Sequence, residues 1–165
     1  MTPDIPSTPP RSSELKFAIV VGKFNGEITT KLLESALEEL DTVGVRREQI
    51  TVVPVPGAFE LPLAARTLAA TGTYDGVVCL GAVIRGETAH FDHVAGQAAA
   101  GIREAAEATG VPVMFGVLTT DTLQQAMDRA GGKHGNKGWD AAMAAMEMAS
   151  LLEQVPKDAS PGGRP

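Results

Sequence analysis

Residues 74–86, YDGVVCLGAVIRG, form the longest apolar run of this 165-residue chain. Their apolar residues do not alternate with polar ones, which is typical of a strand covered on both faces of a parallel sheet. Three further runs predict strands: LKFAIVVG (15–22), ITVVPVPG (50–57) and VPVMFGVLTT (111–120). Pro54 and Pro56 cannot donate backbone hydrogen bonds. We therefore expect either that residues 50–57 form an edge strand or that the two prolines lie at the end of a strand.

Helical patterns separate these runs. Five apolar residues form one stripe that ends at Gly44: Ile28, Leu32, Ala36, Leu40 and Val43. Further helices are expected after residue 57, over 91–110, over about 123–130 and from 139 to about 152. Strands that alternate with helices indicate a parallel sheet with helices on both faces. The expected fold class is therefore α/β, a small doubly wound, flavodoxin-like sheet of four parallel strands.

The length of the chain suits a single domain, which is expected over residues 14–154. Residues 1–13 and 155–165 are rich in Pro, Ser, Thr and Gly and bury little apolar surface. We expect both segments to be disordered, although the first could also lie extended along a neighbouring chain.

Composition excludes several classes of protein. The formal net charge of −6 argues against broad nucleic-acid binding, although a local basic pocket for a small anion remains compatible with it. The single cysteine, Cys79, cannot form an internal disulfide, which fits a reducing compartment. No run is long enough to cross a bilayer, and the N-terminus lacks the apolar core of a signal peptide. We therefore expect a cytoplasmic protein without a membrane partner.

Polar clusters follow each of the four expected strands. They are KFNGE (23–27), GAFE (57–60), RGETAH (85–90) and LTTD (118–121). In doubly wound sheets, ligands bind beyond the carboxyl ends of the strands. The sequence therefore predicts that these clusters share one ligand site.

The cluster after the third strand has several interpretations. Gly86 and Thr88 precede a helix, so their backbone N–H groups could bind phosphate, or Thr88 or Asp92 could simply cap that helix. The stretch HFDH (90–93) contains metal-ligand types, but no third ligand set accompanies it, which disfavours a metal. His90 is placed to act as a general acid or base. His93 is expected to be structural or to lie at an interface.

Residues of the other polar clusters and of the basic segment 128–138 also have more than one interpretation. Phe24 could belong to the core or stack on a flat heterocycle, and Asn25 could cap a helix or hydrogen-bond a polyol. Glu60 could interact with a helix dipole or accept from ligand hydroxyls. The basic segment 128–138 (DRAGGKHGNKG) lacks Walker spacing and could be a solvated loop, or Arg129 could bind phosphate. These residues predict a small, anionic, hydroxylated ligand, with a flat ring if Phe24 stacks on it, and leave the reaction open.

Taken together, the clusters resemble a known family. The matching pieces are GKFNGEIT (22–29), VPGAFELP (55–62), GAVIRGETAHFDHV (81–94), PVMFGVLTTDTLQQAMDRAG (112–131) and GNKG (135–138). Their order across about residues 15–152 resembles that of the lumazine synthase family. The resemblance implies condensation of 5-amino-6-ribitylamino-2,4(1H,3H)-pyrimidinedione with 3,4-dihydroxy-2-butanone 4-phosphate in riboflavin biosynthesis, a transferase reaction without metal or cofactor.

The resemblance also implies roles for individual residues. Phe24 would stack on the pyrimidine, while Asn25, Glu60 and the backbone of Ala58 and Phe59 would hold the ribityl chain. His90 would shuttle protons. The remaining implied substrate-binding residues are Val83 and Ile84 for the pyrimidine edge, Gly86, Glu87 and Thr88 for the phosphate, and Phe115, Arg129 and Lys137 from an adjacent subunit.

The family assembles as pentamers, and some members build twelve pentamers into an icosahedral shell that can enclose riboflavin synthase. The segment GGKHGNKG (131–138) has no insertion and resembles the shell-forming pattern. Two alternatives are an archaeal-type riboflavin synthase and a non-catalytic flavin-binding shell protein. The GAFE, GETAH and GNKG clusters disfavour the first, and the presence of His90, Arg129 and Lys137 disfavours the second.

Overall fold

The structure is a computed structural model that describes residues 4–5 and 14–156. The expectations for segments 1–13 and 155–165 lie outside these residues, apart from Asp4, Ile5, Val155 and Pro156. Within the described ranges, no helix combines the length and apolar character that crossing a bilayer requires.

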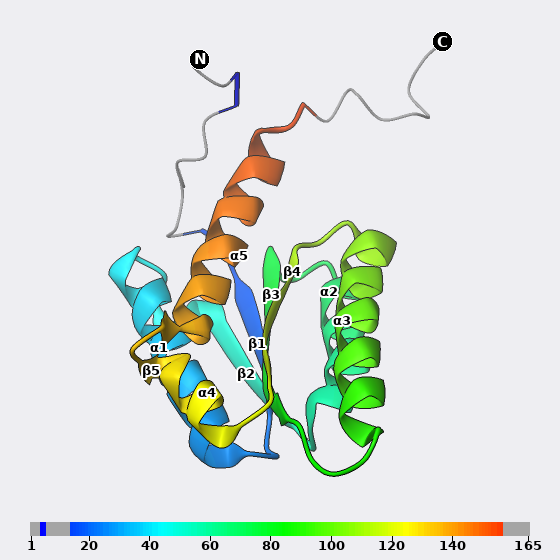
Figure 1. The fold of residues 1–165 in the computed structure, drawn as a ribbon. Helices are drawn as coiled ribbons and strands as arrows, with labels where there is room; N and C mark the ends of the chain where they lie inside the picture. Colours follow the sequence, from blue (N-terminus) through cyan, green and yellow to red (C-terminus); the bar gives the residue numbers. More distant parts are fainter. Residues whose placement is uncertain (1–3, 6–13, 157–165) are drawn as a thin grey trace.

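Four parallel strands form the centre of the molecule (Figure 1). They are β1 (Phe17–Gly22), β2 (Ile50–Val55), β3 (Gly76–Ile84) and β4 (Val113–Thr120). Their order in the sheet is β2-β1-β3-β4, so β2 is an edge strand, as its prolines predicted. β3 is buried along its whole length except at Ile84, which confirms that it is covered on both faces. The expected doubly wound α/β fold is confirmed.

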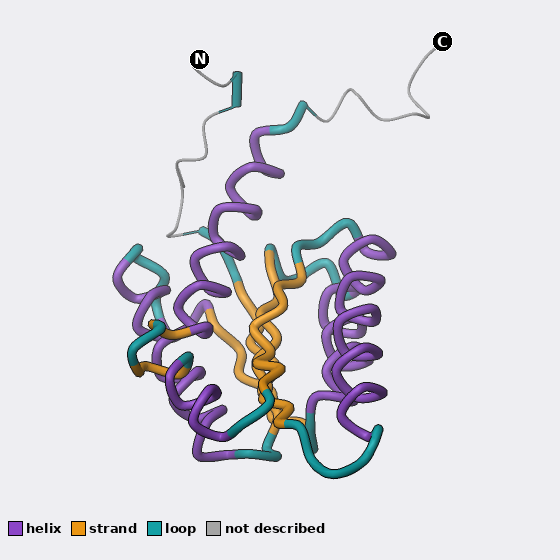
Figure 2. The backbone as a smooth tube through the Cα atoms, viewed as in Figure 1, coloured by secondary structure: helices purple, strands orange, loops and turns teal. Residues whose placement is uncertain are grey.

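Helices cover both faces of this sheet (Figures 1 and 2). One face is covered by α1 (Gly26–Thr42), α4 (Leu123–Asp128) and α5 (Lys137–Gln154). The other face is covered by α2 (Leu61–Ala70) and α3 (His90–Thr109). The crossover connections leave all four strand carboxyl ends at one edge, drawn lowermost in Figure 2.

The core is divided by the sheet into two apolar clusters. Successive strand residues point to opposite faces, so Phe17 and Ile19 pack toward α1 and α5, while Ala18 and Val20 pack toward α2 and α3. Cys79 lies in the second cluster, and its burial raises the pKa of the thiol to about 12. The thiol is therefore protonated at neutral pH and unreactive while the fold is intact.

The structure adds elements that the sequence patterns did not predict. Two short 3-10 helices are present, η1 (Arg47–Gln49) and η2 (Ala58–Glu60). The basic segment, for which one interpretation was a solvated loop, contains an antiparallel hairpin of β5 (Ala130–Gly132) and β6 (Gly135–Asn136). Gly131 and Gly135 have positive φ angles of 103° and 78°, which glycine adopts at little cost. No alternating apolar residues flank the turn, so the usual hairpin signal is missing.

Close packing of α1 against α5 depends on Gly138. A Cβ atom at this position would overlap the backbone carbonyl of Leu32 in α1. We expect Gly138→Ala to lower the free energy of unfolding by about 1–3 kcal/mol, because backbone cannot move aside as a flexible side chain can. Urea denaturation at one fixed protein concentration measures this change.

The matched control is Gly96→Ala in α3, where a Cβ would meet no atom within 4 Å. This substitution should raise stability by roughly 0.5–1 kcal/mol, the usual helical preference for alanine. Equal unfolding curves for the two variants would contradict the packing argument.

Candidate active site

A cleft of about 710 Å³ lies at the carboxyl edge of the sheet. It is formed by the segments that follow β1, β2 and β3, together with the first turns of α3. β2 lies on one side of β1, whereas β3 and β4 lie on the other side, so the order in which strands are added to the sheet switches sides at β1. Ligands of doubly wound proteins bind at such a switch point. The lining residues are Phe24, Pro56, Gly57, Ala58, Phe59, Glu60, Ala82, Val83, Ile84, Gly86, Thr88, His90, Phe91, His93 and Val94.

The turn after β1 places an aromatic ring at the mouth of the cleft. The backbone N–H of Lys23 donates to Val55 (2.8 Å), and that of Phe24 donates to Pro56 (3.0 Å). These bonds continue the pairing beyond the last strand residues and fix where the Phe24 ring lies. Phe24 is 72% exposed, so the interpretation of Phe24 as a core residue is wrong. An exposed ring beside a cleft can stack on a flat ligand.

Asn25 does not cap α1 with its side chain, which corrects one of its two interpretations. Its backbone is left-handed (φ 58°, ψ 45°), a conformation that asparagine tolerates better than most residues. The side-chain Nδ2 donates to the carbonyl of Ala82 in β3 (2.8 Å). Asn25 therefore ties the turn after β1 to β3 beneath the cleft, and its Oδ1 retains acceptor capacity.

The segment after β2 contributes one wall of the cleft. Ala58 is buried, whereas Phe59 (58% exposed) and Glu60 face outward from η2 at the start of α2. Pro62 lies in the first turn of α2, as expected. Glu60 lines the same cleft as Phe24 and Phe59, and its carboxylate is an acceptor for hydroxyl donors.

The turn from β3 to α3 has the features of an anion site. In the described part of the chain, the N–H groups of Gly86, Glu87 and Thr88 donate to no protein acceptor. They precede a 20-residue helix, whose N-terminus favours negative charge. α3 has no side-chain cap, although Thr88 Oγ1 accepts from the backbone N–H of His90 (3.3 Å). Asp92, in the first turn, forms no capping hydrogen bond either, and its Oδ1 lies 3.5 Å from Arg85 NH1.

Two histidines line the cleft from the first turn of α3. His90 and His93 are both exposed and lie three residues apart, so they share one face of the helix. His93, which was expected to be structural or to lie at an interface, also lines the cleft, a position that its helical spacing from His90 could have indicated. Within residues 4–5 and 14–156, no group of three or more His, Cys, Asp or Glu side chains could hold a metal ion.

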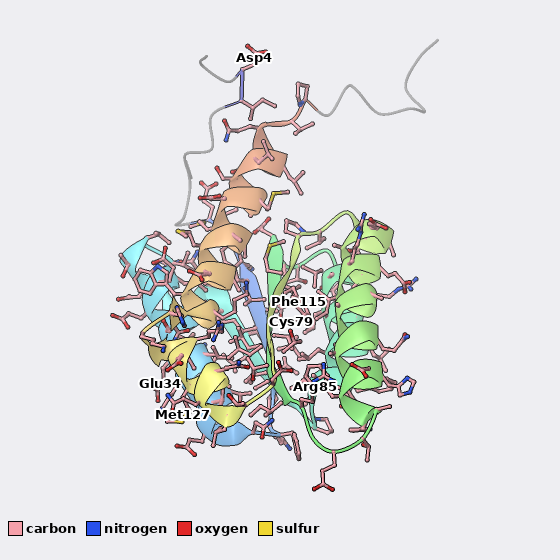
Figure 3. All side chains as sticks on the ribbon, in the orientation of Figure 1. Asp4, Glu34, Cys79, Arg85, Phe115 and Met127 are labelled. Carbon is pink, nitrogen blue, oxygen red and sulfur yellow. The ribbon has the colours of Figure 1, made fainter. Side chains whose placement is uncertain are left out.

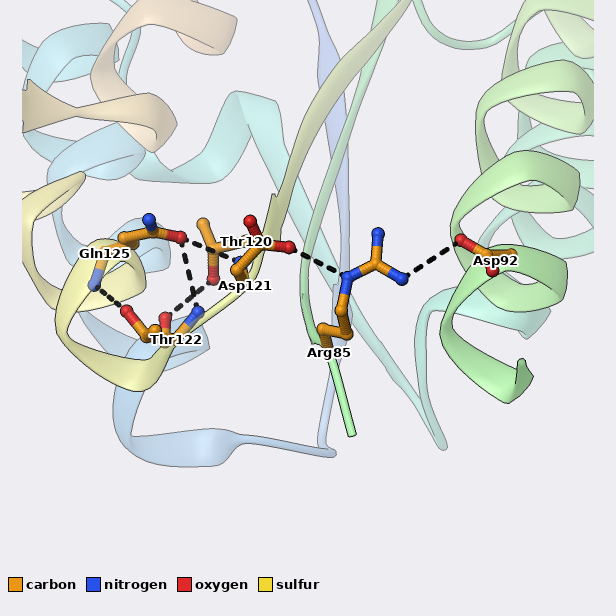
Figure 4. A network of polar contacts seen from close by, with 6 residues as sticks. All are labelled: Arg85, Asp92, Thr120, Asp121, Thr122 and Gln125. Atoms are coloured by element: carbon orange, nitrogen blue, oxygen red, sulfur yellow. Dashed lines mark hydrogen bonds and ion pairs between the residues drawn. The ribbon is translucent and has the colours of Figure 1, made fainter. Parts of the chain in front are cut away.

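Arg85, to which no sequence pattern assigned a role, contacts residues of α3 and the residue that follows β4. Its Nε donates to Asp121 Oδ1 (2.8 Å), and its NH1 lies 3.5 Å from Asp92 Oδ1 (Figure 4). Its guanidinium also lies 4.4 Å from the centroid of the Phe91 ring. The hydrogen bond to Asp121, with the charge of Asp92, raises the pKa of Arg85 above its ordinary value. Arg85 is not among the residues that line the cleft.

Five of the expected site residues are not among those that line this cleft: Asn25 and Glu87 directly follow lining residues in the sequence, whereas Phe115, Arg129 and Lys137 come from other elements. Phe115 is half-buried in β4 among the residues under α2 and α3 (Figure 3). Arg129 follows α4, where its NH1 donates to the carbonyl of Gln125 (3.0 Å). The N–H of Lys137, at the start of α5, donates to the carbonyl of Arg129 (2.9 Å). Arg129 and Lys137 therefore belong to the sheet face opposite α3.

These features define a class of protein. The chain is a doubly wound α/β protein whose switch-point cleft combines an exposed aromatic ring, a carboxylate, uncommitted N–H groups at a helix N-terminus and a titratable histidine pair. This combination suits a flat, hydroxylated ligand that meets an anion.

Sequence comparisons agree with this description. Residues 14–153 match the family model of 6,7-dimethyl-8-ribityllumazine synthase. A 6,7-dimethyl-8-ribityllumazine synthase of Syntrophus aciditrophicus (strain SB) is 54% identical over 141 residues, which cover 86% of this chain and 92% of that relative. The chain belongs to the 6,7-dimethyl-8-ribityllumazine synthase family, as the resemblance indicated.

Proposed function

We propose that the chain carries out its family's reaction in the cleft at the carboxyl edge of the sheet. The reaction condenses 5-amino-6-ribitylamino-2,4(1H,3H)-pyrimidinedione with 3,4-dihydroxy-2-butanone 4-phosphate, giving 6,7-dimethyl-8-ribityllumazine, phosphate and water. The observation that carries the proposal is the convergence of segments after β1, β2 and β3 on one cleft. Residues 14–154 would act as a single domain, with the cytoplasm as its location.

The pyrimidine substrate would occupy the part of the cleft beside Phe24. Its ring would stack on the exposed Phe24 side chain, and its edge would hydrogen-bond backbone groups of Val83 and Ile84 at the end of β3. The ribityl hydroxyls would meet Glu60 and the Oδ1 of Asn25. The backbone of Ala58 and Phe59 would complete this polyol site, since both residues line the same wall.

The butanone phosphate would bind at the turn from β3 to α3. The N–H groups of Gly86, Glu87 and Thr88 are the donors available to its phosphate oxygens. The N-terminus of α3 adds a favourable dipole. Phosphate leaves during the reaction, so stabilising its negative charge favours product formation as well as binding.

His90 would move protons between these two subsites. It lies at the first position of α3, next to the phosphate-binding turn and within the cleft lining. Imine formation, phosphate loss and ring closure each require a proton transfer, and imidazole can accept a proton in its neutral form and return it as imidazolium. Positioning two substrates side by side would supply a large share of the acceleration.

The His90→Ala variant should slow turnover by about 10²–10⁴-fold without abolishing it, because positioning of the substrates remains. Steady-state rates of lumazine formation, followed by its absorbance, measure this effect. His93→Ala is the matched control on the same helix face and should lose much less. Complete loss in a folded, substrate-binding His90→Ala protein would contradict the assignment, as would an equal loss in both variants.

We infer that the site is completed by a second copy of the chain. Arg129 and Lys137 lie on the sheet face opposite α3 and are not among the residues that line the cleft, so an adjacent subunit would supply their substrate contacts. The exposed part of Phe115 would contact substrate bound to an adjacent subunit in the same way. Several large apolar residues are exposed and could be covered by such contacts: Phe59, Leu63, Leu123, Met143, Met148 and Leu152. The assembly proposed is a homo-pentamer, with twelve pentamers in an icosahedral shell whose lumen could hold riboflavin synthase.

The Arg129→Ala variant should raise the KM for 3,4-dihydroxy-2-butanone 4-phosphate, with little change in the KM for the pyrimidine. The reason is that a guanidinium is suited to bidentate phosphate binding, which alanine cannot replace. Varying one substrate at saturating levels of the other separates the two constants. An unchanged KM for the phosphorylated substrate would count against the role of Arg129.

The function itself is tested by mixing purified protein with both substrates and recording lumazine formation. Turnover well above the spontaneous rate is the expected result, and a rate equal to it would reject the enzymatic proposal. Incubation with the lumazine alone tests the archaeal-type riboflavin synthase alternative. Light scattering on the same sample distinguishes a pentamer, a decamer and a 60-subunit shell.

A further inference from the structure

Arg85 makes contacts on both sides of the turn that joins β3 to α3 (residues 86–89), where the phosphate is proposed to bind. The backbone N–H of Arg85 donates to the carbonyl of Thr120 (2.8 Å), which fixes the β3 end of the turn to β4. Its guanidinium reaches across to α3, where it contacts Asp92 (3.5 Å) and the face of Phe91 (4.4 Å). Residues 86–89 lie between these two anchored ends, so one side chain holds both sides of the turn.

The main partner of Arg85 is itself held rigidly. The backbone N–H of Asp121 donates to Gln125 Oε1 (2.8 Å), and Gln125 forms a capping box with Thr122 at the start of α4. Thr120 Oγ1 adds a bond to the carbonyl of Thr122 (2.9 Å). Figure 4 shows this chain of contacts running from α4 through Asp121 and Arg85 to α3. The LTTD cluster (118–121) thus supplies hydrogen-bond acceptors to Arg85 at the start of the turn after β3, although it contributes no residue to the cleft lining.

The charges in this network suit a supporting role. Nε and NH1 of Arg85 contact two carboxylates, and Arg85 is not among the residues that line the cleft. Both ion pairs are largely exposed, and exposed pairs contribute little to global stability. Their effect is therefore expected on the local conformation of residues 86–89.

We propose that Arg85 is a positioning residue that holds the backbone of residues 86–89 in the conformation that binds the phosphate of the butanone substrate. This inference rests on the proposed function, because it takes that turn to be the phosphate subsite. Arg85 acts through the turn and does not touch the substrate. The planar fork of arginine is needed, because lysine cannot reach two carboxylates in fixed directions while also stacking on an aromatic face.

The test compares Arg85→Lys with Arg103→Lys. Arg103 lies in α3 and forms an exposed ion pair with Glu107 (3.0 Å), far from the turn of residues 86–89 in the sequence, so it controls for the loss of an exposed arginine pair that involves this helix. We expect Arg85→Lys to raise the KM for the butanone phosphate and the inhibition constant of inorganic phosphate by about three- to tenfold. The KM for the pyrimidine should stay within about twofold, and Arg103→Lys should change none of these constants.

Asp121→Asn provides a second variant that leaves Arg85 in place and weakens its shortest contact. It should raise the KM for the butanone phosphate and the inhibition constant of inorganic phosphate by a smaller factor than Arg85→Lys. If Arg85→Lys does not fold, Asp121→Asn replaces it in the test. An unchanged inhibition constant for phosphate, or an equal loss for both substrates, would overturn the proposal. If the wild-type protein makes no lumazine, the proposed function fails; if it turns over while these variants bind phosphate normally, only the Arg85 proposal fails.

Discussion

The parallel pairing of the four strands is the constraint on which the rest of the molecule depends. Because β1, β2 and β3 all run in one direction, the segments that follow them meet at one edge of the sheet. β1 lies between β2 and β3, and the helices after β1 and β3 leave toward opposite faces, which opens the cleft. A buried sheet therefore fixes the positions of exposed site residues. Phe24, Glu60 and His90 are far apart in the sequence and line the same cavity for this reason.

Much of the architecture could be predicted from the sequence, because strand burial and helix amphipathicity leave strong periodic patterns. The unbroken apolar run of β3 and the prolines of β2 indicated a central and an edge strand, and the structure confirms both. Three of the four polar clusters at the strand ends contribute residues to one cleft, whereas the fourth, LTTD (118–121), contributes none. Features that depend on contacts between distant residues could not be read in this way. The sequence allowed Asn25 to cap a helix or to hydrogen-bond a polyol. In the structure its side-chain amide donates to the backbone carbonyl of Ala82, 57 residues away, which no local pattern indicates.

Arg85 illustrates the same limit more fully. Neither Asp92 nor Asp121 marks an arginine partner by its spacing, since the ion pairs form only after β3, β4 and α3 have packed together. The hairpin at β5 and β6 was missed for a different reason, because its pairing relies on two positive-φ glycines without flanking apolar residues. Local patterns identified which residues carry chemistry, whereas tertiary contacts determine how those residues are held.

In the proposed active site, one chain supplies the cleft and another supplies Arg129. Subunit mixing tests this claim most directly: Arg129→Ala and His90→Ala chains are denatured together at equal concentrations, refolded, and assayed at limiting butanone phosphate. With random mixing, about a quarter of the sites would combine an intact His90 with an intact Arg129 from the neighbour. Activity in the mixture should therefore rise toward that fraction of the wild-type rate, well above either variant refolded alone. Activity equal to the mean of the two separate variants would contradict a site shared between subunits.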